Sequence, residues 1–202
     1  MNGQETEVKF HTRDLKRIET RLLELQAVLI QPRIHEVNFR FDTPNNELRK
    51  SSRVLRLRQD DKARFTFKGP SVEKAGGVMS RKEIEFVVED FDCAKEFLEE
   101  LGFQAVVFYE KFRATYDLND VHVMLDELPY GDFVEIEGED AASIRNVADA
   151  LGLNWDAMIK AGYHALFDRV SEKYGLDNSK LSFEELKNVK IAVADLKIIA
   201  AD

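Results

Sequence analysis

The amino-acid sequence predicts an α+β fold in which eight antiparallel strands close into a β-barrel and helices pack on its outside. Three observations favour this fold. Apolar and charged residues alternate with a period of two in eight segments, and segments with helical period lie between them. The order of these segments also occurs twice: EVKF at 7–10 recurs as EIEF at 83–86, and FD at 41–42 recurs as YD at 116–117. We therefore expect two βαβββ halves related by an approximate two-fold axis.

Three segments have the helical period and recognisable ends. The first runs from about Arg13 to Leu29 with Thr12 as candidate N-cap, the second from Asp92 to Leu101, and the third from Ala142 to Leu151. The second and third stop at a glycine, which suits the left-handed position after a helix. Each carries one apolar stripe, so we expect all three to lie on a larger apolar surface.

The strands are the segments with period two. They are expected at residues 4–11, 34–42, 53–59, 63–68, 81–88, 105–117, 120–127 and 132–138. Two open half-sheets of this kind remove their exposed edges by closing on each other, which predicts the barrel.

The last part of the chain is predicted to be helical and to pack on the barrel exterior. Residues 155–175 have the pattern of a helix ended by Gly175, and Ser182 with Glu185 forms a candidate capping box. No linker composition separates this part from the rest. We expect a single domain over residues 1–202, with the barrel at 4–138 and exterior helices at 141–200.

Composition limits the function classes. A formal net charge of −9 over 202 residues argues against a nucleic-acid binder, because such proteins neutralise phosphates with a surplus of Lys and Arg. The single cysteine, Cys93, excludes an intrachain disulfide. The sequence has no apolar run long enough to span a membrane and no signal-peptide pattern at its start. We expect a cytoplasmic protein that binds neither nucleic acid nor membrane.

Charges of the same sign recur at positions i and i+2, which share one face of a strand. The acidic pairs are Glu5 with Glu7, Glu83 with Glu85 and Glu135 with Glu137, and the basic pairs are Arg56 with Arg58 and Lys111 with Arg113. In any single strand, this alternation of charged and apolar residues is also explained by an ordinary sheet with one face exposed to solvent. The whole set, in which like charges repel, fits better with a barrel interior where a divalent cation binds the acids and a polyanion binds the bases. A chain of phosphates that carries a metal ion needs both groups.

The segment Glu5-x-Glu7-x-Lys9 resembles the ExExK signature of the CYTH superfamily, the triphosphate tunnel metalloenzymes. Similar segments follow in order: FDTP at 41–44, LRLR at 55–58, TFKGP at 66–70, RKEIEF at 81–86, EKFR at 110–113 and LDELPYGDFVEIEG at 125–138. ExExK alone is a weak signal, whereas the ordered set is a strong one. The resemblance covers roughly residues 4–165 and is nearest to the class IV adenylyl cyclase and thiamine triphosphatase-like branch.

The resemblance implies a role for each matching residue. It implies that Mg²⁺ or Mn²⁺ is held by Glu5, Glu7, Glu83, Asp126, Glu135 and Glu137. It implies that a triphosphate is held by Lys9, Arg56, Arg58, Lys68, Lys111 and Arg113, with Arg81 and Glu85 in support. Lys9 is also the candidate catalytic residue, as a base, with simple phosphate binding as the alternative.

The resemblance implies a metal-dependent enzyme that acts on a nucleotide, thiamine triphosphate or inorganic triphosphate. We expect hydrolysis of a terminal phosphate, because phosphoryl transfer needs mainly positioning and charge stabilisation. Cyclisation of ATP to cyclic AMP and pyrophosphate needs the same tunnel and is the first alternative. A non-catalytic nucleotide or polyphosphate binding module is the second. The organic part of the substrate and a homodimer are left open.

Two other groups have ordinary structural interpretations. Asp42, Thr43 and Pro44 are interpreted as turn residues. Tyr163 and Phe167 are interpreted as core packing in a late helix, with contact to the organic part of a substrate as the alternative.

Overall fold

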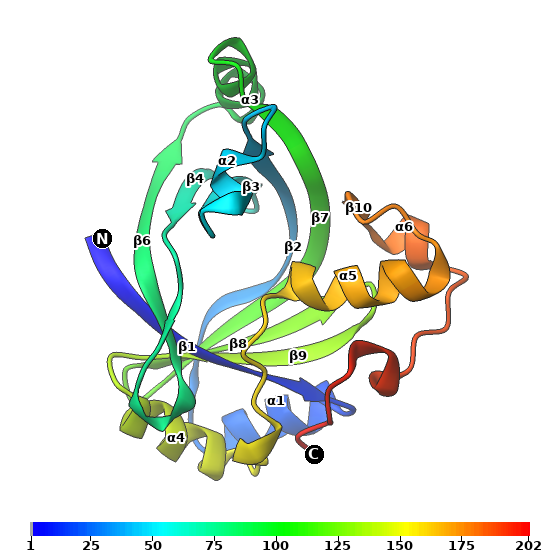
Figure 1. Ribbon diagram of the computed structural model, residues 1–202. Coiled ribbons are helices and arrows are strands. Elements are labelled where there is room, and N and C mark those ends of the chain that lie inside the picture. The colour runs from blue at the N-terminus through cyan, green and yellow to red at the C-terminus, as the bar shows by residue number, and fades with distance from the viewer. Residues whose placement is uncertain (1) are drawn as a thin grey trace.

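A closed β-barrel of eight antiparallel strands, with helices on its outside, forms the centre of the molecule (Figure 1). The computed structural model describes the backbone of residues 2–202 and the side chains of residues 6–202. The barrel strands are β1 (Asn2–Thr12), β2 (Val28–Asp42), β3 (Val54–Gln59), β4 (Ala63–Lys68), β6 (Met79–Val88), β7 (Gln104–Leu118), β8 (Val121–Leu128) and β9 (Gly131–Glu137). Their order is β1-β9-β8-β7-β2-β3-β4-β6, and pairing of β1 with β6 closes the ring. The predicted fold class is confirmed.

The two predicted βαβββ halves are present in chain order. The first half is β1, α1 (Leu15–Glu24), β2, β3 and β4, and the second is β6, α3 (Phe91–Glu100), β7, β8 and β9. β1 pairs antiparallel with β6, and β2 pairs antiparallel with β7. Equivalent strands of the two halves therefore meet at two seams, and neither half keeps an open sheet edge.

Outward-facing side chains of the strands pack under the helices. α1 and α4 (Ala141–Ala150) cover one side of the barrel, where Phe10 and Ile18 are fully buried. α3 covers the opposite side, over Phe41 and Leu57, as Figure 1 shows. Because apolar residues take the outward positions, the charged residues that alternate with them face the barrel interior.

Shorter elements connect and follow these. They are α2 (Glu47–Lys50), β5 (Val72–Glu73), η1 (Ala75–Gly77), η2 (Trp155–Ala157), α5 (Tyr163–Tyr174), β10 (Lys180–Leu181), α6 (Phe183–Leu186) and η3 (Val193–Leu196). Over residues 2–202, none of the helices combines the length and apolar character needed to cross a membrane. The cytoplasmic location stays a prediction.

The first helix is shorter than the sequence predicts. The expected helix covers 13–29, but α1 ends at Glu24, and Gln26 has a left-handed φ of 61°. Leu29, which fits the apolar stripe of the helix, belongs to β2 and pairs with Tyr116 of β7. Pairing with β7 supplies the backbone of this segment with hydrogen-bond partners. Because β7 is far away in the sequence, the local periodicity cannot predict this pairing.

The end of the chain is less helical than predicted. The expected helix over 155–175 is divided into η2 and α5 by an extended segment, in which the N–H of Ile159 donates to the carbonyl of Lys9 at 2.7 Å. Gly175 ends α5 with a φ of 65°, as predicted. Further exterior helices are predicted for residues 176–202, but this part is mainly irregular. β10 pairs with β7, whereas α6 and η3 are each a single turn.

One end of the barrel is filled by aromatic side chains. Phe133 shares the inward face of β9 with Glu135 and packs edge-on against Tyr130 and Tyr163, at ring distances of 5.5 and 5.2 Å. Phe167 of α5 stacks on Tyr130. The predicted core role of Phe167 is therefore confirmed, and α5 closes this part of the interior.

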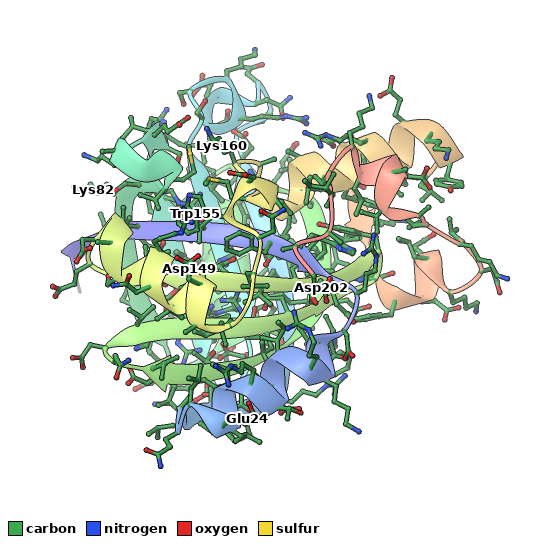
Figure 2. All side chains as sticks on the ribbon, turned by 90° about the horizontal axis from the view of Figure 1, so that it is seen from below. Glu24, Lys82, Asp149, Trp155, Lys160 and Asp202 are labelled. Carbon is green, nitrogen blue, oxygen red and sulfur yellow. The ribbon has the colours of Figure 1, made fainter. Side chains whose placement is uncertain are left out.

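Asp202 fixes the loop between β1 and α1 (Figure 2). Its carboxylate accepts hydrogen bonds from the hydroxyl of Thr12 and from the N–H groups of Arg13 and Asp14, the latter two at 2.9 and 3.1 Å. Asp14, not the predicted Thr12, is the N-cap of α1. The last residues thereby hold the point where the chain leaves the barrel.

Asp202→Ala should lower the free energy of unfolding by about 1–3 kcal/mol, because it leaves three donors without their acceptor. Urea unfolding of the full chain measures this change. Glu184→Ala, which removes a carboxylate from an exposed pair with Lys187, should cost less than about 0.5 kcal/mol. Equal effects of the two substitutions would contradict the role of Asp202.

Candidate active site

The barrel encloses a cavity of about 950 Å³. Among the described residues, its lining comes from every barrel strand except β8, from the connection between β2 and β3, from α5 with the segment before it, and from β10. β6 shows the alternation clearly: Arg81, Glu83 and Glu85 line the cavity, whereas Lys82 is exposed at the outer edge of the molecule (Figure 2). The charged face of the strands is therefore the inner face.

The cavity is far more basic than the chain. The described lining contains twelve Lys and Arg residues and seven Asp and Glu residues, a surplus of five positive charges. The whole chain has a formal net charge of −9. Such a local surplus, in a wall of low dielectric, attracts anions even though the chain as a whole repels them.

The acids and bases gather on facing walls. In the ring, β6, β1 and β9 are neighbours, and they carry Glu83, Glu7, Glu135 and Glu137. β7, β2 and β3 form the opposite wall, with basic residues that include Arg56, Arg58, Lys111 and Arg113. A ligand in the cavity therefore lies between carboxylates on one side and cations on the other.

Lys9 lies within the acidic wall. Its Nζ is 2.5 Å from Oε1 of Glu7 and 3.2 Å from Oε2 of Glu135, and all three side chains are buried. Burial lowers the pKa of Lys9, but the carboxylates of Glu135 and Glu7 outweigh it and raise the pKa above its ordinary value. The ammonium ion therefore balances two carboxylates.

Asp126 on β8 is fully buried behind the basic wall. It accepts from Nε and Nη2 of Arg113, both at 2.6 Å, lies 3.1 Å from Nζ of Lys111, and accepts from the hydroxyl of Tyr163 at 2.6 Å. Burial lowers the pKa of Arg113, and the carboxylates of Asp126 and Glu135 reverse this and raise it. Asp126 thus fixes two cavity-lining cations in place.

A second network orients the basic pair on β3. Nη2 of Arg56 donates to the hydroxyl of Thr66 at 3.0 Å, and this hydroxyl donates to Glu85 at 2.9 Å. Nη2 of Arg58 donates to the other oxygen of Glu85 at 3.1 Å. Glu85 therefore holds both guanidinium groups toward the cavity, and its supporting role in triphosphate binding stays a prediction.

Glu36 is an interior carboxylate that the sequence analysis missed. It is 2% exposed, with Lys111 at 3.6 Å and Arg58 at 3.8 Å. Burial raises its pKa, but these cations and Arg113 lower it to about 2. The signal was the alternation of Glu36, Asn38 and Arg40 with apolar residues on β2, which the same period-two test detects.

The structure places nearly all predicted site residues together. Those that line the cavity are Glu7, Lys9, Arg56, Arg58, Lys68, Arg81, Glu83, Glu85, Lys111, Arg113, Glu135 and Glu137. Asp126 lies behind the lining. The backbone of Glu5 pairs with Arg81 of β6, and its side chain lies outside the described part. The role of each residue toward metal or phosphate stays a prediction.

The acidic wall fits a divalent cation. Glu7 and Glu137 lie directly opposite each other on β1 and β9, where two like charges repel unless a cation separates them. Oε2 of Glu7 is buried and has no hydrogen-bond partner within residues 6–202. In that same part of the chain no three acidic or histidine side chains converge on one point. Mg²⁺ needs no such cage, because it binds through one or two carboxylates plus substrate phosphates.

Tyr163 enters the site from α5. Its ring lies 5.5 Å from Nζ of Lys9 and 5.4 Å from Nζ of Lys111, so it separates two cations at the inner end of the cavity. Burial, followed by the charge of Asp126, raises its pKa well above the ordinary value. The sequence analysis favoured core packing for Tyr163 and kept contact with a substrate as the alternative, because a tyrosine on an apolar helix face usually signals core packing.

Comparison with known proteins gives a consistent picture. The CYTH domain family model matches residues 3–151. A Methanocaldococcus jannaschii protein named "Putative adenylate cyclase" is 29% identical over 135 residues, which cover 66% of this chain and 75% of that protein. A solved Vibrio parahaemolyticus structure, also named as a putative adenylate cyclase, has a TM-score of 0.75 at 18% identity and covers 83% of this chain and 99% of its own. A Pyrococcus horikoshii structure has a TM-score of 0.66 at 27% identity, covering 79% and 96%.

Glu36→Gln should flatten the acid side of the stability curve. The pKa of Glu36 is lowered from 4.5 to about 2, so its stabilising contribution is complete above pH 4.5 and disappears as the pH falls toward 2. The full difference corresponds to on the order of 3 kcal/mol. Urea unfolding across this pH range should show a steeper loss for the wild type than for Glu36→Gln.

Glu127→Gln is the matched control, because Glu127 pairs with Arg33 on the outside of the barrel. It should keep the slope of the wild type. Parallel curves for the wild type and Glu36→Gln would show that Glu36 is not held ionised by the interior cations.

Proposed function

Because this chain belongs to the CYTH family, we propose that it is a divalent-metal-dependent enzyme that holds a triphosphate group in the barrel cavity and hydrolyses its terminal phosphate. The observation that supports this best is the cavity's surplus of five positive charges in a chain of net charge −9. An enclosed basic site with an acidic wall suits a polyanion that carries a metal ion.

The basic wall supplies the phosphate contacts. Arg56, Arg58 and Arg113 offer planar guanidinium groups that bind phosphate oxygens in pairs, and Lys111 adds a point charge. Glu85 and Asp126 hold these cations before any ligand arrives. Donors fixed in advance stabilise the charge that develops on the transferred phosphoryl group without rearranging during the reaction.

The acidic wall would hold the metal. One or two of Glu7, Glu135 and Glu137 are the proposed ligands among the described side chains, together with phosphate oxygens, and Glu5 and Glu83 are further predicted members. A bound Mg²⁺ or Mn²⁺ neutralises phosphate charge and activates water. Lys9, between Glu7 and Glu135, is placed to contact the same phosphates. A metal-ligand role for Asp126 stays a prediction, and its contacts with Lys111 and Arg113 support a positioning role.

Cyclisation of ATP to cyclic AMP and pyrophosphate is the second candidate. It is favoured by the name of the relative from Methanocaldococcus jannaschii. Cyclisation would use the same clamp, with the ribose hydroxyl placed against the α-phosphate. The homodimer and the absence of nucleic-acid binding stay predictions.

A product assay separates the two reactions. The full chain, incubated with ATP, tripolyphosphate or thiamine triphosphate and Mg²⁺ or Mn²⁺, should release orthophosphate and form no cyclic AMP. Chelation of the metal should abolish the release. If the products are cyclic AMP and pyrophosphate, the protein is a cyclase and not a hydrolase. If the protein binds these ligands but converts none of them with either metal, it is a non-catalytic binding module.

Glu135→Gln should reduce kcat by about 100-fold or more and raise the metal concentration needed for half-maximal activity, because it removes a charged ligand from the acidic wall. The fold should survive, since Gln keeps the shape of Glu. Glu99→Gln, on the exposed surface of α3, should behave as the wild type. An unchanged metal requirement in Glu135→Gln would refute the proposed metal position.

A further inference from the structure

Three arginines outside the predicted phosphate clamp line one end of the cavity. Arg40 lies on β2, and Arg49 and Arg53 lie in the connection between β2 and β3. Within the described residues, the side chain of Arg40 makes no hydrogen bond or ion pair. In the same described part, the guanidinium group of Arg53 donates to the hydroxyl of Ser51, at 2.7 Å, and forms no ion pair. Positive charge thus accumulates here with little compensation.

The acids near this cluster offset only part of its charge, because two carboxylates, Asp42 and Asp168, face three arginines. Asp168 of α5 is 3.8 Å from Nη2 of Arg49, at the outer limit of an ion pair. Asp42 lines the same end, but its two oxygens accept the N–H groups of Thr43, Leu48 and Arg49 at 2.8 to 2.9 Å. Asp42 therefore holds the turn that carries Arg49, which confirms its predicted turn role.

The cluster continues the phosphate clamp without a gap. Arg40 on β2 lies directly opposite Arg56 on β3, so two guanidinium groups of the inner face are cross-strand neighbours. Like charges in this position repel and destabilise a sheet unless an anion lies between them. A phosphate chain bound by Arg56 would therefore reach Arg40 next.

The connection that carries Arg49 and Arg53 has no counterpart in the second half of the barrel. β7 and β8 are joined by Asn119 and Asp120, both with positive φ, as a two-residue hairpin requires. The equivalent link between β2 and β3 spans residues 43–53 and contains α2. The two-residue link between β7 and β8 shows that a short turn is enough at this position of the barrel, and the longer link places Arg49 and Arg53 in the cavity lining.

His164 independently marks the same place. It follows Tyr163 in α5, lines the cavity, and its buried Nδ1 has no hydrogen-bond partner within the described chain. Burial, followed by the charge of Arg40, lowers its pKa to about 4. Its Nε2 lies 3.5 Å from Asp168, and the neutral imidazole adds no charge to this end of the cavity.

We propose that Arg40, Arg49 and Arg53 form a second anion subsite, which binds a phosphate linked beyond the third phosphate of the chain in the clamp. The inference rests on the proposed binding of a triphosphate in the cavity and extends the substrate class to molecules with at least four linked phosphates. Two sources share this chemistry: a linear inorganic polyphosphate and a nucleoside polyphosphate.

Calorimetric titration tests the subsite in metal-free buffer with a chelator, where no turnover interferes. The ligands are tripolyphosphate against tetrapolyphosphate, and ATP against adenosine 5′-tetraphosphate. The fourth phosphate should tighten binding about tenfold, the value of one charge-assisted contact. A gain in both pairs, or in the inorganic pair alone, identifies the phosphate chain as the ligand. A gain only in the nucleotide pair identifies a nucleoside polyphosphate.

Arg40→Gln and Arg53→Gln should each weaken tetraphosphate binding at least about fivefold more than triphosphate binding. Arg33→Gln is the matched control, because it removes the same charge from the outer face of β2. Thermal melting verifies that each variant folds. If triphosphates bind but a fourth phosphate adds no affinity, or if both variants weaken all ligands equally, the subsite is refuted while the triphosphate clamp stands.

Discussion

Ionised side chains enclosed by a closed barrel are the constraint on which the rest of this structure depends. A buried charge costs several kcal/mol unless an opposite charge lies within reach. Lys9, Arg113 and Glu36 are all withdrawn from solvent, and each has opposite charges nearby. The interior pairs therefore offset the cost of burying these charges and keep the groups ionised. The same ionised groups are the ones that phosphate and metal binding require.

The segment beyond the family match completes the site. The family model ends at residue 151, but α5 brings Tyr163 against Asp126 and places His164 in the cavity lining. The final residues return to the barrel, where Asp202 binds the loop after β1. The irregular end of the chain is thus tied to the barrel that carries the charges.

The strands, the repeat and most of the cavity lining follow from the sequence, because side-chain direction in a strand depends only on position. Glu36 and Arg40 were not predicted as site residues, because the prediction used pairs of like charge at positions i and i+2. On the inner face of β2 the neutral Asn38 lies between them. The helix predicted over 13–29 is too long, because its apolar stripe continues into residues that pair with β7, a strand far along the chain. The helix predicted over 155–175 is interrupted for the same reason, since Ile159 forms a backbone hydrogen bond with β1.

If the acidic and basic walls bind a metal ion and a phosphate chain between them, a crystal structure with Mn²⁺ and tripolyphosphate will locate both ligands in the cavity, because anomalous scattering identifies manganese independently of the protein. We expect a manganese peak beside Glu7, Glu135 and Glu137, with phosphates against Arg56, Arg58 and Arg113. Manganese or phosphate bound only on the outer surface, with the interior pairs undisturbed, would show that the two walls do not form such a site.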